Sequence, residues 1–282
     1  MLAAAPAPAL PEHDGVVEVY RTSRTLILHA ERRVDRLPVV LKAIAPGCPD
    51  PLARKRLAEE FAILRALSMD GVVRAERWIS TGFGPMLELE DLGRTTLASL
   101  PEPMPVDRAL DVGIQLATIL AAVHRHGILH LDISAANVAY NPSTGRVALL
   151  DFGAAARIEG RVTRPSADGG LGGTLGYWAP EQTGRLGLEV DRRTDLYSLG
   201  AVLYQVLVGA PPGPTGDLLA AVHAVLAQVP AAPSAVRTAV PDTASRIVMK
   251  LLAKVAEDRY QGARGLRHDL ESVRVSPTPT TA

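Results

Sequence analysis

The chain has 282 residues, 47% of them hydrophobic, and its 30 basic residues balance 30 acidic ones. This length and apolar content can form a core without metals or disulfides, and the zero net charge excludes a molecule-wide field that would attract nucleic acid or an anionic membrane. The single cysteine, Cys48, excludes an internal disulfide and is typical of a reducing compartment. We therefore expect a cytoplasmic protein with neither a nucleic-acid nor a membrane partner.

Both ends of the chain have the composition of tails. Residues 1–15 (MLAAAPAPALPEHDG) contain several prolines and lack the basic start of a signal peptide, which predicts a disordered tail. Residues 275–282 are rich in Pro and Thr and are expected to form a tail or a linker toward a further domain. The longest apolar run, at 199–210, is shorter than the roughly 20 residues that span a bilayer, so we expect a buried helix there.

Short β-branched runs fill the first part of the folded chain, and helical spacing fills the second. Strands are expected at 16–20, 25–30, 39–44, 72–80, 85–90 and 147–151. Helices are expected at 51–67, beginning at Pro51, and at 106–126, 192–209, 242–253 and 263–273. The sequence therefore predicts an α+β fold with a small, mostly β lobe at 16–92 and a larger, mostly helical lobe at 93–274, on the two sides of a cleft.

Three polar motifs follow one another in the second lobe: HLDISAANV (130–138), Asp151-Phe152-Gly153 and GTLGYWAPE (173–181). Each motif alone is weak, because patterns this short occur by chance, but their order and spacing together are specific. With these motifs the chain resembles the eukaryotic-type Ser/Thr protein kinase family over residues 16–274. Further positions of the family pattern are matched by Lys42, Glu60, Asp195 and Arg259.

One branch of that family has sequence segments similar to SRTLILHA, PVVLK, EDLG, APEQTGR and VDRRTDLYSLG in this chain. In this branch the kinase domain precedes AAA-type ATPase, GAF and histidine-kinase modules in bacterial hybrid sensor proteins. The resemblance implies a bilobal protein-kinase-like fold, ATP and Mg²⁺ as cofactors, and a protein substrate or a downstream signalling domain as partner. The oligomeric state is left open.

The resemblance also implies a role for each matched residue. Lys42 would hold the α- and β-phosphates and be oriented by Glu60, Asp132 would accept or orient the proton of the attacking hydroxyl, and Asn137 and Asp151 would hold the metal. Further contacts to the nucleotide are expected from Ser23, Thr25, Ile27, Val40, Leu89, Glu90, Leu92 and Ala139. Structural roles around the activation segment are expected for His130, Phe152, Gly153, Thr174, Glu181, Asp195 and Arg259.

Three departures from the family pattern weaken the expectation of ordinary activity. The loop that should cover the phosphates, residues 20–25, has no glycine, so the side chains of Ser23 and Thr25 would have to substitute for backbone N–H groups. Leu131 replaces an arginine that pairs with a phosphate on the activation segment, so we expect switching without phosphorylation of Thr163 or Ser166. Ser134 replaces the lysine that steadies the transferred phosphate, and slow turnover is expected.

Three hypotheses are compatible with these observations. The first is an atypical ATP-dependent Ser/Thr protein kinase in bacterial signalling. It is favoured because the chain has the expected base Asp132, the expected metal ligands Asn137 and Asp151, and the Lys42–Glu60 pair. The second is a pseudokinase that senses nucleotide or acts as a scaffold. The third is a small-molecule kinase of the aminoglycoside-phosphotransferase kind, which GTLGYWAPE disfavours because that segment builds a platform for a peptide, with Thr174 favouring a Ser or Thr acceptor.

Overall fold

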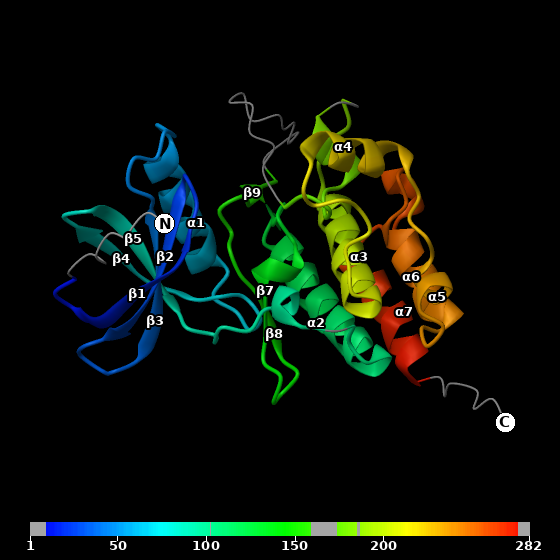
Figure 1. Cartoon of the computed structure of the whole chain (residues 1–282), viewed down its shortest axis with the longest axis horizontal. Coiled ribbons are helices and arrows are strands. Elements are labelled where there is room, and N and C mark those ends of the chain that lie inside the picture. Colours follow the sequence, from blue (N-terminus) through cyan, green and yellow to red (C-terminus); the bar gives the residue numbers. More distant parts are fainter. Residues whose placement is uncertain (1–9, 102, 159–173, 185–186, 276–282) are drawn as a thin grey trace. The chain divides into compact units, whose positions relative to one another are not determined.

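The computed structural model describes residues 10–101, 103–158, 174–184 and 187–275 (Figure 1). The internal contacts divide the chain into two compact units, Met1–Gly93 and Arg94–Ala282. The first unit is built on an antiparallel sheet and the second mainly on helices, which confirms the expected α+β class.

The first unit is a five-stranded antiparallel sheet with the order β1-β2-β3-β5-β4 and one helix. Its elements are β1 (His13–Arg21), β2 (Thr25–Arg32), β3 (Pro38–Ile44), α1 (Ala53–Ala66), β4 (Ala75–Thr81) and β5 (Gly84–Glu90). Alternating apolar residues such as Leu26, Leu28, Leu41 and Met86 form a buried cluster on one face of the sheet. The short β-branched runs from which the sequence predicted five strands overlap these five strands.

The N-terminal segment is ordered further toward its start than the sequence predicted. Leu10 is buried in the same apolar cluster, and β1 begins at His13, whose Nε2 lies 2.7 Å from Oε2 of Glu88. The prediction of a disordered tail over residues 1–15 is therefore wrong for Leu10–Gly15, while residues 1–9 lie outside the described chain. Composition misled the prediction, because the partners that order this segment lie far away in the sequence.

Two further boundaries differ from the prediction. Helix α1 begins at Ala53 rather than Pro51, after a turn in which a carboxylate oxygen of Asp50 accepts the N–H of Leu52 at 2.9 Å. Strand β4 begins at Ala75 rather than Val72, although Val72 is buried. Burial alone does not make a strand, which needs backbone partners as well.

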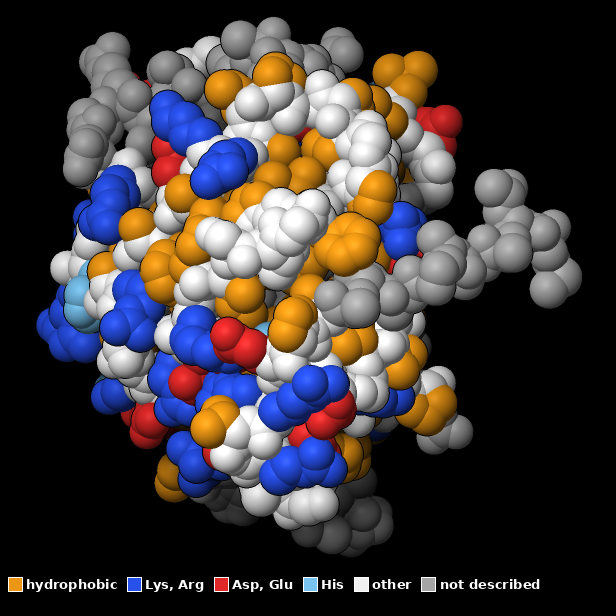
Figure 2. All heavy atoms as spheres, turned by 90° about the vertical axis from the view of Figure 1, so that its left-hand side faces the viewer, with side chains coloured by type: hydrophobic (Ala, Val, Ile, Leu, Met, Phe, Trp, Pro, Cys, Tyr) orange, Lys and Arg blue, Asp and Glu red, His pale blue; other side chains and the backbone are white. Residues whose placement is uncertain are grey.

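On the face drawn in Figure 2, basic and acidic side chains lie beside one another. Exposed ion pairs in the first unit join Arg33 to Asp14 at 2.8 Å and Arg74 to Glu76 at 2.6 Å. The balance of charge in the composition is thus also a local balance in this unit.

The second unit consists of helices with short strands between them. Its helices are α2 (Val106–Arg125), α3 (Arg192–Val208), α4 (Leu218–Ala227), α5 (Pro233–Val236), α6 (Asp242–Leu251) and α7 (Ala263–Val275). Its strands pair as β6 (Ile128–Leu129) with β9 (Ala156–Arg157) and as β7 (Val138–Tyr140) with β8 (Val147–Leu149). The expected strand at 147–151 thus ends at Leu149, before Asp151.

Helix α3 is the centre of the second unit. Nearly all its side chains are buried, and it contacts α2 and α6, in agreement with the helix expected for the apolar run at 199–210 (Figure 1). Asp191 caps its start by accepting the N–H of Arg193 at 2.7 Å, and Gly209 ends it with φ 99°. Within the part of the chain that the structure describes, no helix has both the length and the hydropathy needed to cross a membrane.

The sequence prediction missed α4. Its start is marked by Asp217, whose side chain accepts the N–H of Ala220 at 2.6 Å. An Asp before the run LLAAVHAVLA is an N-cap signal, but the run is apolar on all sides and lacks helical periodicity.

Candidate active site

One face of the sheet gathers four residues expected to contact a nucleotide. Val40 lies opposite Leu89 in the β3–β5 ladder, and Lys42 lies opposite Ile27 in the β2–β3 ladder. Residues directly opposite in antiparallel strands point to the same face, as do residues two apart in one strand. The register therefore puts Lys42 beside three apolar side chains, on the face opposite the cluster of Leu41.

Lys42 and Glu60 form a buried ion pair in the first unit. Nζ of Lys42 lies 2.7 Å from Oε1 of Glu60, and the two side chains are 7% and 2% exposed. Each of the two charges lowers the cost of burying the other. Because the pair links β3 to α1, the position of α1 decides where the ammonium group lies.

The glycine-free turn between β1 and β2 is closed by a residue that the sequence reasoning missed, Thr22. Its hydroxyl oxygen accepts the N–H groups of Arg24 at 3.1 Å and Thr25 at 2.9 Å. Backbone donors that a glycine-rich loop offers to phosphates are thus bonded within the turn here. Ser23 is exposed and Thr25 is half-buried, so both residues present a side-chain hydroxyl group near the tip of the turn.

The segment after β5 is held by its own acidic side chains. Oε1 of Glu90 accepts the N–H of Arg74 at 2.7 Å, and Oδ1 of Asp91 accepts the N–H of Gly93 at 2.8 Å. Leu92, between them, is partly buried. The backbone expected to bind a base is therefore fixed before any ligand arrives.

In the second unit, Asp195 on α3 holds the loop that carries Asp132. Its Oδ1 accepts the N–H of Leu131 at 2.8 Å, and its Oδ2 accepts the N–H of His130 at 2.9 Å. Leu131 has φ 64°, a region that favours glycine, so these bonds stabilise a conformation that leucine rarely adopts. Burial by itself raises the pKa of Asp195, but hydrogen bonding and charge from His124 outweigh it and lower that pKa.

The carboxylate of Asp132 is fixed by Thr174. Both the N–H and the hydroxyl of Thr174 donate to Oδ1 of Asp132 at 2.9 Å. The N–H of Asp132 donates to Nδ1 of His130 at 3.3 Å, so this imidazole carries its proton on Nε2, which donates to the carbonyl of Leu150 at 3.0 Å. Burial raises the pKa of Asp132, and the charge of Asp151 raises it further.

Asn137 and Asp151 supply oxygen atoms of the kind that a magnesium ion prefers. The side-chain N–H of Asn137 donates to the carbonyl of Asp132 at 2.9 Å, which leaves the amide oxygen as its acceptor end. Asp151 has φ 51° and accepts the N–H of Gly153 at 3.0 Å. Asn137 lies at the end of a 3-10 turn (Ala135–Asn137), followed by Ala139 on β7.

Leu131 and Ser134 stand at the two positions of the loop where the family pattern has a cation. Leu131 is buried with Leu129 and Val190, and Ala156 packs against this cluster. Ser134 is fully buried, and its hydroxyl oxygen has no hydrogen-bond partner among the described residues. Thr163 and Ser166, which the phosphorylation hypothesis concerns, lie outside the described residues.

The remaining residues of the expected set hold the second unit together. Phe152 is buried, with its ring centroid 4.5 Å from that of His130. Nη1 of Arg259 lies 2.8 Å from Oε1 of Glu181, and both side chains are almost fully buried. A second residue that the sequence reasoning missed is Gln182, whose amide donates to the carbonyl of Leu131 at 2.8 Å.

Comparison with known proteins agrees with this geometry. The family model described as "Protein kinase domain" matches residues 25–270. The chain therefore belongs to the protein kinase family. It is 31% identical over 272 residues to serine/threonine-protein kinase PknB of Mycobacterium tuberculosis, and 34% identical over 268 residues to the DNA damage-responsive serine/threonine-protein kinase RqkA of Deinococcus radiodurans.

These alignments cover most of this chain but a minor part of each relative. The match to PknB spans 94% of this chain and 42% of PknB, and the match to RqkA spans 92% of this chain and 38% of RqkA. The probable serine/threonine-protein kinase SCO3848 of Streptomyces coelicolor is 30% identical over 265 residues, with 38% of its length covered. The chain thus spans less than half the length of each of these relatives.

Proposed function

We propose that this chain is an ATP-dependent Ser/Thr protein kinase domain that transfers the γ-phosphoryl group to a protein hydroxyl in bacterial signalling. The observation that carries the proposal is the carboxylate of Asp132, one oxygen of which accepts two hydrogen bonds from Thr174. The buried Lys42–Glu60 pair and the similarity to three Ser/Thr kinases support it. Its setting would be the cytoplasm.

Each site residue has a task in this proposal. Phosphoryl transfer depends mainly on positioning and charge neutralisation. Lys42 would bind the α- and β-phosphates, and Oδ2 of Asp132 would orient the attacking hydroxyl while Thr174 holds Oδ1. Asn137 and Asp151 fit Mg²⁺ by their donor chemistry, and this ion, when bound, would neutralise charge on the phosphates.

The remaining proposed contacts follow the sequence pattern. Ile27, Val40, Leu89 and Ala139 would contact the adenine, and the backbone of residues 90–92 would bind its polar edge. Ser23 and Thr25 would reach the phosphates by their side chains, because Thr22 occupies backbone donors of the turn. Binding is then expected to be weaker than with a glycine-rich loop.

We also propose that the chain belongs to the branch in which a kinase domain precedes sensor and histidine-kinase modules. This proposal is supported by the sequence of residues 179–185 and 190–200 and by the Pro/Thr-rich composition after residue 275. The partner would then be a protein substrate or a downstream domain of the same protein.

A paired assay tests the proposed activity. Calorimetry would measure magnesium-dependent ATP binding, and radiolabelled ATP would measure transfer to the chain itself and to a generic Ser/Thr acceptor. The exposed Asp107→Asn is the matched control for Asp132→Asn. Transfer that is lost with Asp132→Asn and kept with Asp107→Asn supports the proposal. ATP binding without transfer would instead identify a pseudokinase. Transfer to an aminoglycoside, offered as an alternative acceptor, would identify a small-molecule kinase.

A further inference from the structure

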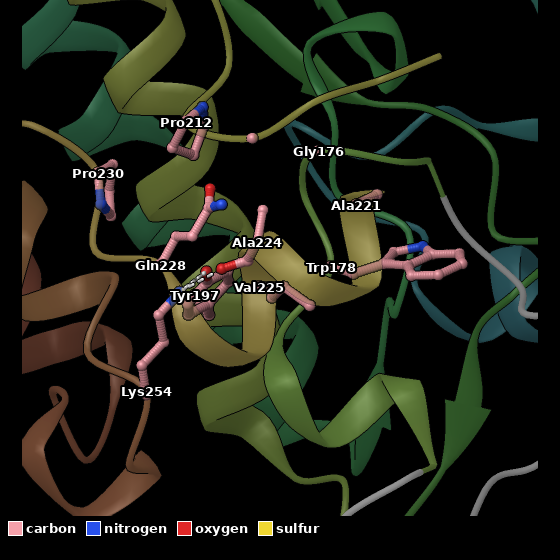
Figure 3. Close-up of a pocket in the computed structure, with 11 residues that line it drawn as sticks. Gly176, Trp178, Tyr197, Pro212, Ala221, Ala224, Val225, Gln228, Pro230 and Lys254 are labelled. Carbon is pink, nitrogen blue, oxygen red and sulfur yellow. Dashed lines mark hydrogen bonds between the residues drawn. The ribbon is translucent and has the colours of Figure 1, made fainter. Parts of the chain in front are cut away.

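Lys254 reaches into a pocket of the second unit. The pocket is lined by Trp178, Tyr197 on α3, Ala221 and Val225 on α4, and Pro230. Figure 3 shows Lys254 extending toward Tyr197 and α4, with Gln228 beside it. Its walls combine apolar side chains with the polar side chains of Tyr197, Gln228 and Lys254.

The ammonium group of Lys254 is poorly satisfied by the protein. Its nearest acceptors are the carbonyl of Ala224 at 3.3 Å and the hydroxyl of Tyr197 at 3.5 Å, both long for a charged donor. No carboxylate forms an ion pair with it among the described residues. The pocket therefore holds a cation without a matching anion.

A second cation, Arg259, lies close to Lys254 but is already paired with a carboxylate. The guanidinium of Arg259 lies 4.9 Å from the ring centroid of Tyr197, and Nζ of Lys254 lies 5.9 Å from the same centroid. Arg259 is compensated by Glu181, whereas Lys254 has no such partner in the described chain. Burial, together with the charge of Arg259, lowers the pKa of Lys254 to about 8.

The surface beside the pocket is unusually apolar. Leu218 and Leu219, at the start of α4, are 50% and 70% exposed, and Val229, just after α4, is 74% exposed. Leu218 precedes Ala221 by three residues and Val225 by seven, so these side chains share one face of the helix. Exposed apolar side chains beside a half-buried lysine that has no carboxylate partner among the described residues fit a partner segment that is both apolar and acidic.

We propose that this pocket, which we call the Lys254 pocket, is a docking site for a protein partner. The occupant would be a short segment of that partner in which one Asp or Glu carboxylate pairs with Lys254. Its flanking apolar side chains would cover Leu218 and Val229. The proposal can be tested apart from phosphoryl transfer, because Lys254, Leu218 and Val229 have no assigned role in that reaction.

A peptide selection tests the proposal with three forms of the whole chain. A phage-displayed heptapeptide library would be selected against the wild type, Lys254→Met and Lys250→Met. Lys250 is the matched control, because it is an exposed lysine that lies over the ring of Tyr260, at 4.3 Å from the centroid, and does not line the pocket. Thermal unfolding would establish that Lys254→Met is folded, as expected for an unbranched apolar side chain in an apolar pocket.

The expected result is enrichment of apolar peptides with one Asp or Glu on the wild type and on Lys250→Met, but not on Lys254→Met. Fluorescence anisotropy with an enriched peptide and its Gln or Asn counterpart should show that loss of the carboxylate weakens binding about tenfold or more. Selection without an acidic preference, the same preference on Lys254→Met, or no enrichment at all would overturn the proposal.

Discussion

At the scale of single residues, the catalytic loop combines an ordinary geometry with an unusual chemistry. Oδ1 of Asp132 accepts a hydrogen bond from Thr174, and the side-chain amide of Asn137 donates to the carbonyl of Asp132. The neighbouring Ser134 offers a hydroxyl where the family pattern has a cation. The lost charge, rather than a displaced backbone, is therefore the expected cause of slow turnover.

Ser134→Lys should raise kcat for phosphoryl transfer about tenfold, because a cation would then stand next to the charge that develops on the transferred group. Steady-state kinetics with a generic protein acceptor would measure the change. The control is Ser143→Lys, which adds the same charge at an exposed position of the β7–β8 turn. An equal rise in both variants, or none in Ser134→Lys, would show that this position does not limit the rate.

At the scale of secondary-structure elements, a buried carboxylate joins three parts of the first unit. Glu88 on β5 is fully buried and bonds to Arg77 on β4 at 2.7 Å, to Arg32 on β2 at 2.8 Å and to His13 on β1 at 2.7 Å. Burial by itself raises the pKa of Glu88, but the hydrogen bonds from Arg77 and His13 and the charges of Arg77 and Arg32 outweigh it and lower the pKa to about 2. Ionised Glu88 thus stabilises the sheet together with its N-terminal strand.

The stability that Glu88 contributes should depend on pH. Since its folded-state pKa is about 2 and its ordinary value is 4.5, the contribution is complete above pH 4.5 and is lost as pH falls toward 2. Glu88→Gln should lower the free energy of unfolding at pH 7 by about 2 kcal/mol and flatten the loss of stability between those two pH values.

Denaturant unfolding at several pH values would measure both effects. The exposed Glu59→Gln on α1 provides the control and should change stability by less than about 0.5 kcal/mol. If Glu88→Gln kept the acid sensitivity of the wild type, other carboxylates would have to be responsible for it.

At the scale of the whole chain, the second unit is closed by an ion pair between residues 78 positions apart. Arg259 bonds Glu181 through both ends of its guanidinium, at 2.8 and 3.0 Å, and also donates to the carbonyl of Arg193 at 3.1 Å. Thr194 donates to the same Glu181 at 2.7 Å. These bonds connect the end of the GTLGYWAPE segment to the start of α3 and to the loop before α7.

Arg259→Met should lower the free energy of unfolding by about 3 kcal/mol, because Glu181 would remain buried without a cation. Arg267→Met is the control, since its pair with Glu271 is exposed and should contribute about 0.5 kcal/mol or less. Urea unfolding would compare the two. A similar, small loss in both variants would contradict a structural role for the Glu181–Arg259 pair.

Local patterns in the sequence were sufficient for most elements. Short β-branched runs indicated the five strands of the first unit, and motif order and spacing led to the prediction of Asp132, Asn137 and Asp151 as site residues. They failed at Leu10–Gly15, at the boundaries of α1 and β4, and at α4. In each case distant partners or a capping side chain, rather than periodicity, decide the structure.

The sequence by itself determined the α+β class and the protein kinase family, since the periodicity of strands and helices and the order and spacing of the motifs can be read along the chain. Only the tertiary structure decided that Glu88 on β5 bonds to side chains of three other strands, and that Lys254 faces a pocket without a described carboxylate partner. These features depend on side chains that meet in space although tens of residues can separate them. Long-range burial and charge pairing leave no local pattern from which they could be read.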